Sequence, residues 1–218
     1  MHCSMFLATL ALLPSVFSFP APLTAPLAPP PHDDCGDAST KSTCDLSSIV
    51  QPASALQPPV AGAKLVLIAL GQGTQNYTCG TNLTAAPAAI GAKARLLDAS
   101  CLVAKTPGVS TIQLGIIEES TNAKAIGAHF FVDNTTPEFD IAGIGNTEVK
   151  KAQDTPAPNP TRDVKWLRLT AQTQGTTSNV KEIYRINTVG GLAPPNCLGR
   201  KAGDVVTVPY EAQYWVYA

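Results

Sequence analysis

The sequence predicts an all-β fold, an antiparallel β-sandwich or barrel in a single domain that follows a proline-rich N-terminal arm. Three observations support this prediction. Apolar residues recur mostly with a period of two, and the helical period of 3.6 is scarce. The apolar runs are short, rich in β-branched and aromatic residues, and bounded by Gly, Pro, Asn or Ser-Thr clusters. Seven or more such strands without intervening helices are typical of sandwiches and barrels.

The first predicted strand covers residues 64–70 (KLVLIAL), a continuous apolar run typical of a strand that is covered on both faces. The later predicted strands are residues 94–100, 110–117, 127–133, 164–171, 180–188 and 210–217. Only residues 83–94 have a helix-friendly composition, and Pro87 and Gly91 limit a helix there to one or two turns.

The last predicted strand separates its side chains into two faces. One face carries Tyr210, Ala212, Tyr214 and Val216, and the other carries Glu211, Gln213, Trp215 and Tyr217. The first face is expected to pack into the core.

Residues 1–18 read as a secretory signal peptide that is cut after Ser18, because a short apolar stretch precedes small residues. A membrane anchor needs about 20 apolar residues, and Pro14 interrupts a stretch that is already too short. We therefore expect a secreted protein, extracellular or associated with the cell wall. Residues 19–60 are rich in proline and form the predicted arm or linker, and residues 61–218 form the predicted β domain.

The net charge of −1 and the charged fraction of 14% exclude two classes of partner. A nucleic-acid partner requires a Lys/Arg stripe that neutralises phosphates, and the sequence contains none. Binding to a membrane surface is not expected, for the same reason.

The chain has six cysteines, of which Cys3 would leave with the signal peptide. The remaining disulfide candidates are Cys35, Cys44, Cys79, Cys101 and Cys197. In an oxidising compartment they predict two disulfides and one spare thiol, with Cys79–Cys101 as the preferred pair. A small loop closed near residues 32–44 is also considered. A zinc site is disfavoured because no Cys-x-x-Cys spacing exists.

Because we expect a secreted protein, three Asn-x-Thr sequons, at Asn76, Asn82 and Asn134, are potential glycosylation sites. Each is expected to carry a glycan on an exposed loop or strand edge.

The run Gly71-Gln72-Gly73 resembles the start of a Gly-x-Gly-x-x-Gly dinucleotide fingerprint, but Asn76 stands where the third glycine belongs. The residues that follow are not expected to form the helix whose N-terminus would bind the phosphates, because they contain two sequons and a cysteine. We therefore expect no cofactor, and an NAD-dependent dehydrogenase is the least favoured function. The glycine pair is interpreted as a hairpin or bulge, with a second strand starting at Gln75.

Several segments together resemble a secreted family known as domain of unknown function 3455. They are LIALGQGTQNYTC (67–79), LLDAS (96–100), GAHFF (127–131), VKWLRL (164–169), YRINTVGGLAPPNC (184–197) and VPYEAQYWVY (208–217). The resemblance runs from about Leu56 to the C-terminus. It implies an all-β extracellular domain, best known from filamentous fungi and also found in bacteria. The family has no established activity or catalytic residue, although some members carry a malate dehydrogenase label.

A hydrolase is the alternative function. Only His32 and His129 would remain after signal removal, so a catalytic histidine would be His129, with Asp133 or Asp140 to orient it. No Gly-x-Ser-x-Gly elbow supplies a nucleophile. Carboxylates for glycoside hydrolysis are available at Glu118, Glu119, Glu138, Asp140, Glu182 and Glu211, but their spacing selects no pair.

A binding module, rather than an enzyme, is the favoured function. Trp and Tyr residues concentrate in three late strands, and aromatic faces can stack on sugar rings. Trp166, Tyr210 and Tyr214 are expected in the core. Trp215 and Tyr217 are the candidates for an exposed platform, unless the arm covers them, with Arg185 and Asn187 as hydrogen-bonding neighbours. The expected ligand is a cell-wall polysaccharide or another extracellular ligand.

Overall fold

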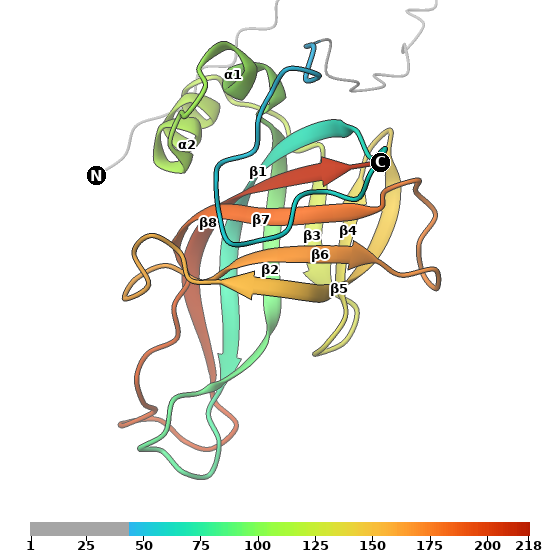
Figure 1. Cartoon of the computed structure of the whole chain (residues 1–218). Helices are drawn as coiled ribbons and strands as arrows, with labels where there is room; N and C mark the ends of the chain where they lie inside the picture. The colour runs from blue at the N-terminus through green and yellow to red at the C-terminus, as the bar shows by residue number, and fades with distance from the viewer. Residues whose placement is uncertain (1–43) are drawn as a thin grey trace, which may run out of the picture. The chain divides into compact units, whose positions relative to one another are not determined.

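The computed structural model describes residues 44–218. The expected signal peptide, Cys35, His32 and the first part of the arm lie outside the described residues. In the described part, eight antiparallel strands follow one another around a closed barrel, and β1 pairs with β8 to close it (Figure 1). The strands are β1 (Leu65–Thr78), β2 (Ala88–Asp98), β3 (Gly127–Phe131), β4 (Pro137–Ile141), β5 (Gly145–Thr155), β6 (Trp166–Ala171), β7 (Glu182–Gly190) and β8 (Val205–Tyr217). The all-β prediction is confirmed, and the barrel is the form adopted.

The alternation predicted for the last strand divides the apolar residues into two clusters. Tyr210, Ala212, Tyr214 and Val216 belong to the cluster that fills the barrel. Trp215 and Tyr217 point the other way, into a second cluster between the outer face of the barrel and the segments that cover it. From Ala212 to Tyr217 both faces of β8 are therefore buried, each in a different apolar environment.

Two helices lie between β2 and β3, where a strand at 110–117 was expected. They are α1 (Ser100–Lys105) and α2 (Thr111–Ser120). Ser110 and Gln113 form a reciprocal capping box at the start of α2. Leu114 and Glu118 are buried four residues apart on the face that packs on the barrel. The strand prediction was wrong because β-branched composition was given more weight than the cap and this helical spacing.

Three further differences concern strands. The helix-friendly segment 83–94 is not helical, since its second half belongs to β2 and is paired with β1. The strand β4 was missed because its sequence, PEFDI, is short and begins with proline, and β5 was missed because its sequence, GNTEVKKAQDT, is largely polar. Pairing with neighbouring strands, rather than local composition, places these residues in the sheet.

The glycine pair lies inside a continuous β1, so the expected hairpin or bulge at the pair, with a second strand from Gln75, is wrong. A Cβ on Gly71 would lie 2.4 Å from the ring of Tyr214, and a Cβ on Gly73 would lie 1.9 Å from the backbone oxygen of Lys93. The glycines therefore allow close approach within the sheet. The register shift with β2 falls later, between Asn76 and Tyr77, and a strand, not a phosphate-binding helix, follows Gly73.

The described part of the arm packs on the outer face of the barrel. Leu46 and Leu56 are buried in the outer cluster. The hydroxyl of Tyr184 donates to the backbone oxygen of Gln57 at 2.9 Å, and the backbone N–H of Val60 donates to Glu182 Oε2 at 3.1 Å. Burial and the carboxylate of Glu182 raise the pKa of Tyr184 to about 12, so its hydroxyl stays a donor. Residues 46–60 are therefore attached to the barrel.

Two disulfides form within residues 44–218, Cys44–Cys101 and Cys79–Cys197. The preferred pair Cys79–Cys101 and a small loop that ends at Cys44 were both wrong. The first disulfide joins the arm to α1, and the second joins the end of β1 to the segment before β8. The pairing depends on how the barrel brings distant segments together, which cysteine spacing does not reveal.

None of the helices within residues 44–218 is long and apolar enough to cross a membrane.

Candidate ligand-binding site

A pocket of about 230 Å³ lies on the outer face of the barrel, between the arm and the connection from α1 to α2. One wall comes from the arm and the other from α1 and the following loop, while β7 and β8 supply the floor. The lining residues are Ser48, Ile49, Val50, Pro52, Val103, Pro107, Gly108, Val109, Asn187, Gln213 and Trp215. The walls are mainly apolar, and most of the polar groups lie on the floor.

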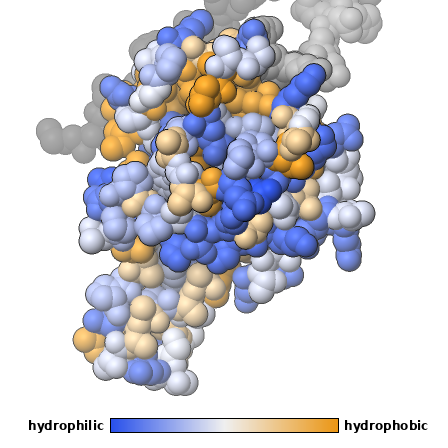
Figure 2. Space-filling view, viewed as in Figure 1, coloured by the Kyte–Doolittle hydropathy of each residue, from blue (hydrophilic) through white to orange (hydrophobic). Residues whose placement is uncertain are grey.

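Apolar residues also gather outside this pocket. On the face shown in Figure 2 they concentrate in the upper part, around the helices, whereas the middle of the face is mostly hydrophilic. Val50 on the arm and Ile112 and Ile116 on α2 are exposed.

The floor of the pocket is a hydrogen-bonded set of three side chains. The indole Nε1–H of Trp215 donates to Gln213 Oε1 at 3.2 Å, and Asn187 Nδ2 donates to the same oxygen at 2.9 Å. Gln213 Nε2 donates to the backbone oxygen of Val109 at 3.2 Å. Because an indole N–H can only donate, it determines the orientation of both amides. Asn187 Oδ1, which has no partner within residues 44–218, is therefore left as an acceptor.

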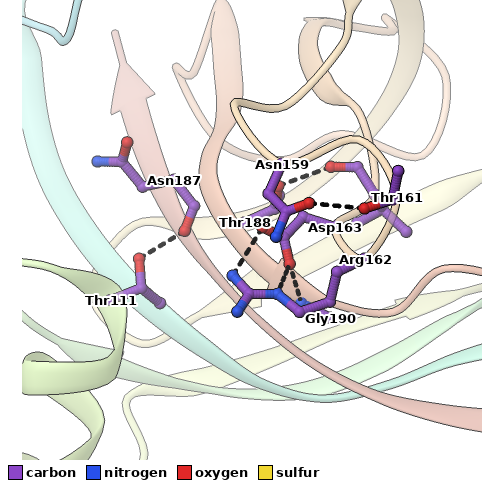
Figure 3. A network of polar contacts seen from close by, with 9 residues as sticks. Thr111, Asn159, Thr161, Arg162, Asp163, Asn187, Thr188 and Gly190 are labelled. Carbon is purple, nitrogen blue, oxygen red and sulfur yellow. Dashed lines mark hydrogen bonds and ion pairs between the residues drawn. The ribbon is translucent and has the colours of Figure 1, made fainter.

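A bulge in β7 brings Asn187 to this position. The register between β7 and β8 shifts between Ile186 and Val189, and Asn187 adopts a left-handed φ of 49°. A bulge re-aims a side chain, and asparagine tolerates this conformation better than most residues. Thr111 at the start of α2 donates its hydroxyl to the backbone oxygen of Asn187 at 2.5 Å, as Figure 3 shows.

A second set of contacts, drawn in Figure 3, holds Thr188 and Gly190, which follow the bulge. Asp163 accepts hydrogen bonds from the backbone N–H of Gly190 at 2.7 Å and from Arg162 Nε at 2.6 Å. Thr188 donates to the backbone oxygen of Val164 at 2.6 Å. Although burial opposes ionisation, these bonds lower the pKa of Asp163, which remains a charged acceptor. The bulge is thus fixed on both sides.

The exposed aromatic platform expected at Trp215 and Tyr217 is not formed. Trp215 is 2% exposed and Tyr217 is 7% exposed. The arm covers them, and Tyr217 donates its hydroxyl to Gln51 Oε1 at 2.9 Å. Trp215 nevertheless lines the pocket together with Asn187, so two of the four predicted ligand-binding residues meet there.

Arg185 lies on the opposite side of the barrel wall from Asn187. Its cross-strand neighbours Leu167 and Tyr214 belong to the interior, so its side chain points inward. Its Nη2 donates to the backbone oxygen of Lys165 at 2.9 Å. Arg185 and Asn187 are two residues apart and would share a face in a regular strand, but the bulge at Asn187 turns the two side chains to opposite faces.

His129 is also inside the barrel. The residue is 3% exposed, and its ring stacks on that of Phe139 with centroids 4.2 Å apart. Its Nδ1–H donates a hydrogen bond to the backbone oxygen of Glu138 at 2.9 Å. Burial, with a smaller effect from the charge of Arg185, lowers its pKa from 6.5 to about 4. His129 is therefore a neutral core residue.

The carboxylates proposed to orient His129 are used elsewhere. Asp133 is exposed at the turn between β3 and β4, where its Oδ1 accepts bonds from the backbone N–H groups of Thr135 and Thr136 at 2.6 and 2.7 Å. Asp140 is exposed and pairs across the sheet with Ala128 and Asn146. No hydrogen bond joins His129 to either carboxylate in the described structure, so the geometry does not support this dyad.

The remaining acidic candidates are divided among several places. Glu182 forms an ion pair with Arg168. Glu138 on β4 lies directly opposite Glu148 on the neighbouring β5. Burial and the nearby negative charges raise the pKa of Glu138. Glu119 and Glu211 line one shallow groove. No group of three or more His, Cys, Asp or Glu among residues 44–218 could hold a metal ion.

The three sequons lie in different environments. Asn82 and Asn134 are exposed in loops. Asn76 is half-buried within β1, where its Oδ1 accepts a bond from the hydroxyl of Thr74 at 3.0 Å.

The sequence interpretation missed Gln213 and both walls of the pocket. Alternation with Trp215 placed Gln213 on the correct face, but a single Gln among aromatic residues indicates nothing more. The walls come from residues 48–52 and 103–109, which are far from β7 and β8 in sequence, and no local pattern links them.

The fold and the pocket define an all-β, disulfide-bonded domain with a small, mainly apolar cavity outside its barrel. The family model described as "Protein of unknown function (DUF3455)" matches residues 59–218. The chain therefore belongs to this family, and the resemblance found in the sequence is confirmed. No curated protein and no solved structure matches the chain significantly.

Proposed function

We propose that the chain is a secreted binding module that takes up a small extracellular ligand in the pocket above Trp215 and Asn187. Secretion is supported by the signal-peptide pattern and by the two disulfides, since disulfides persist mainly in oxidising compartments. The proposal depends most on one observation. The mainly apolar pocket has on its floor a left-handed asparagine whose Oδ1 has no partner within the described residues.

The shape and chemistry of the pocket favour one class of ligand. Apolar walls with a few polar groups are typical of small-molecule sites. Asn187 Oδ1 is an acceptor, so the ligand is a compact apolar group that carries one hydroxyl or N–H donor. A polysaccharide fits this pocket less well, because a sugar ring has many hydroxyls and the faces of Trp215 and Tyr217 are covered.

The test uses the full secreted chain and two probes of nearly equal size. Cyclohexanol has the required donor, whereas methoxycyclohexane has the same ring without it. Isothermal titration calorimetry should show saturable binding of cyclohexanol and up to roughly tenfold weaker binding of methoxycyclohexane, which is the value of one neutral hydrogen bond. The proposal is wrong if neither probe saturates, or if both bind equally.

The Asn187→Gly variant is the matched control, because glycine keeps the left-handed backbone and removes only the amide. This variant should bind both probes with similar affinity. A Trp215→Ala variant is less suitable, since removing a buried tryptophan costs about 3 to 5 kcal/mol of stability.

A further inference from the structure

Three polar side chains form a row across the outer face of strands β2, β1 and β8. Gln72, between the two glycines of β1, lies directly opposite Arg95 on one side and Glu211 on the other. Arg95 donates from Nε and Nη2 to Gln72 Oε1 at 3.1 and 2.7 Å. Gln72 Nε2 donates to Glu211 Oε1 at 2.7 Å. The row is thus ordered by its own hydrogen bonds.

This row lines a groove of about 490 Å³ that does not share residues with the Trp215 pocket. Val189 and Pro209 supply apolar contacts beside it, and Glu119 of α2 lines it as well. The helix approaches the row closely at Gly115, where a Cβ would lie 3.0 Å from Glu211 Oε1 and 3.1 Å from Gln72 Nε2. Packing of α2 therefore limits the positions that these side chains can adopt.

The hydrogen bonds within the row leave donors and acceptors side by side. A guanidinium has five N–H donors and Arg95 uses two of them, while Gln72 Nε2 keeps one of its hydrogens. Glu211 Oε2 remains an acceptor. A hydroxyl both donates and accepts, so neighbouring hydroxyls of one ligand match this alternation.

Charges of both signs lie in the groove, so neither an anion nor a cation meets a uniform field of opposite charge. Glu211 and Glu119 repel an anion, and Arg95 repels a cation. A neutral ligand rich in hydroxyls meets neither penalty, and its C–H groups can contact Val189 and Pro209. We propose that this groove binds a neutral saccharide through vicinal hydroxyls held by Arg95, Gln72 and Glu211. This site is independent of the ligand proposed for the Trp215 pocket.

The experiment titrates the full secreted chain with soluble oligomers of glucose, of mannose and of N-acetylglucosamine, by isothermal titration calorimetry. At least one oligomer should bind saturably. Glu211→Gln and Arg95→Gln should each weaken that binding tenfold or more, because each removes a charge-assisted hydrogen bond. The unfolding midpoint of each variant shows whether the barrel is intact.

Two control variants make the result specific. Lys93→Gln removes an exposed charge two residues from Arg95 on the same face of β2 and should leave binding unchanged. Asn187→Gly changes only the other pocket and should also have no effect here. The proposal is overturned if no oligomer binds, or if binding survives both groove variants. A failure of cyclohexanol to bind would not affect it.

Discussion

The hydroxyl of Tyr217 on β8 donates to the side chain of Gln51, 166 residues earlier in the chain, at a distance of 2.9 Å. This contact places the arm over aromatic side chains that would otherwise form an exposed surface. Burial raises the pKa of Tyr217, so the hydroxyl remains protonated and able to donate. The arm therefore closes the aromatic face, and its residues 48–52 form one wall of the pocket.

The two glycines of β1 are expected to serve the sheet and not a cofactor. Gly73→Ala would place a Cβ 1.9 Å from the backbone oxygen of Lys93, which cannot move without breaking the pairing of β1 and β2. We expect a loss of at least about 3 kcal/mol in the free energy of unfolding, measured with urea. Gly80→Ala is the control, because nothing lies within 4 Å of its Cβ position. Equal stability of the two variants would contradict this role of Gly73.

Because the backbone of Asn187 is left-handed, we expect its substitution by alanine and by glycine to have different effects on stability. Both Asn187→Ala and Asn187→Gly lose the bond to Gln213, but only glycine accepts a φ of 49° without strain. The alanine variant should therefore be less stable than the glycine variant by about 1 to 2 kcal/mol in urea unfolding. If alanine were as stable as glycine, the bulge would not require this conformation.

Because His129 is buried and neutral, we expect the free energy of unfolding to fall at mildly acidic pH. Burial lowers its folded-state pKa to about 4, whereas the unfolded chain has a value near 6.5. The unfolded state therefore binds the proton first, and the free energy of unfolding falls as the pH drops from about 6.5 to about 4. The loss attributable to His129 is about 3 kcal/mol and levels off below pH 4.

The control for this pH dependence is His129→Gln, which removes the titrating group. Urea unfolding of this variant should show a flatter profile between pH 6.5 and 4 than the wild type. A profile with the same slope in both proteins would show that His129 does not control this pH dependence. The buried Glu118 and Glu138 have raised pKa values and act in the opposite direction, because the folded state takes up their protons first.

The disulfide between Cys79 and Cys197 joins the end of β1 to the segment before β8, where Tyr77 and Val206 form a small apolar cluster. The double variant Cys79→Ser/Cys197→Ser should lower the free energy of unfolding by about 2 to 5 kcal/mol. A melting temperature unchanged from the wild type would show that the small cluster and the strand pairing suffice without the crosslink.

The three sequons are expected to differ in occupancy when the chain is expressed through a secretory pathway. Asn82 and Asn134 lie in exposed loops, whereas Asn76 is half-buried in a strand that is paired on both sides. Mass spectrometry of tryptic glycopeptides should therefore find glycans at Asn82 and Asn134, and the lowest occupancy at Asn76. Full occupancy of Asn76 would show that the strand tolerates a glycan at this position.

The local sequence was sufficient to predict the all-β class and the family, and it also separated the two faces of β8. Alternation of side chains is a property of a single strand, so Tyr214 and Trp215 could be assigned to opposite faces without knowledge of their neighbours. It was not sufficient for β4 and β5, whose polar residues become strands only through pairing, or for α2, where the cap outweighs β-branched composition.

Only the tertiary structure decided what covers each face. Closure of the barrel turned Arg185 and His129 inward and brought Cys79 to Cys197, and the arm buried Trp215 and Tyr217. The pocket at Asn187 and the row through Gln72 each combine residues from distant segments. Such contacts depend on how strands and loops meet in space, and the physical forces that select them act between residues that no local pattern connects.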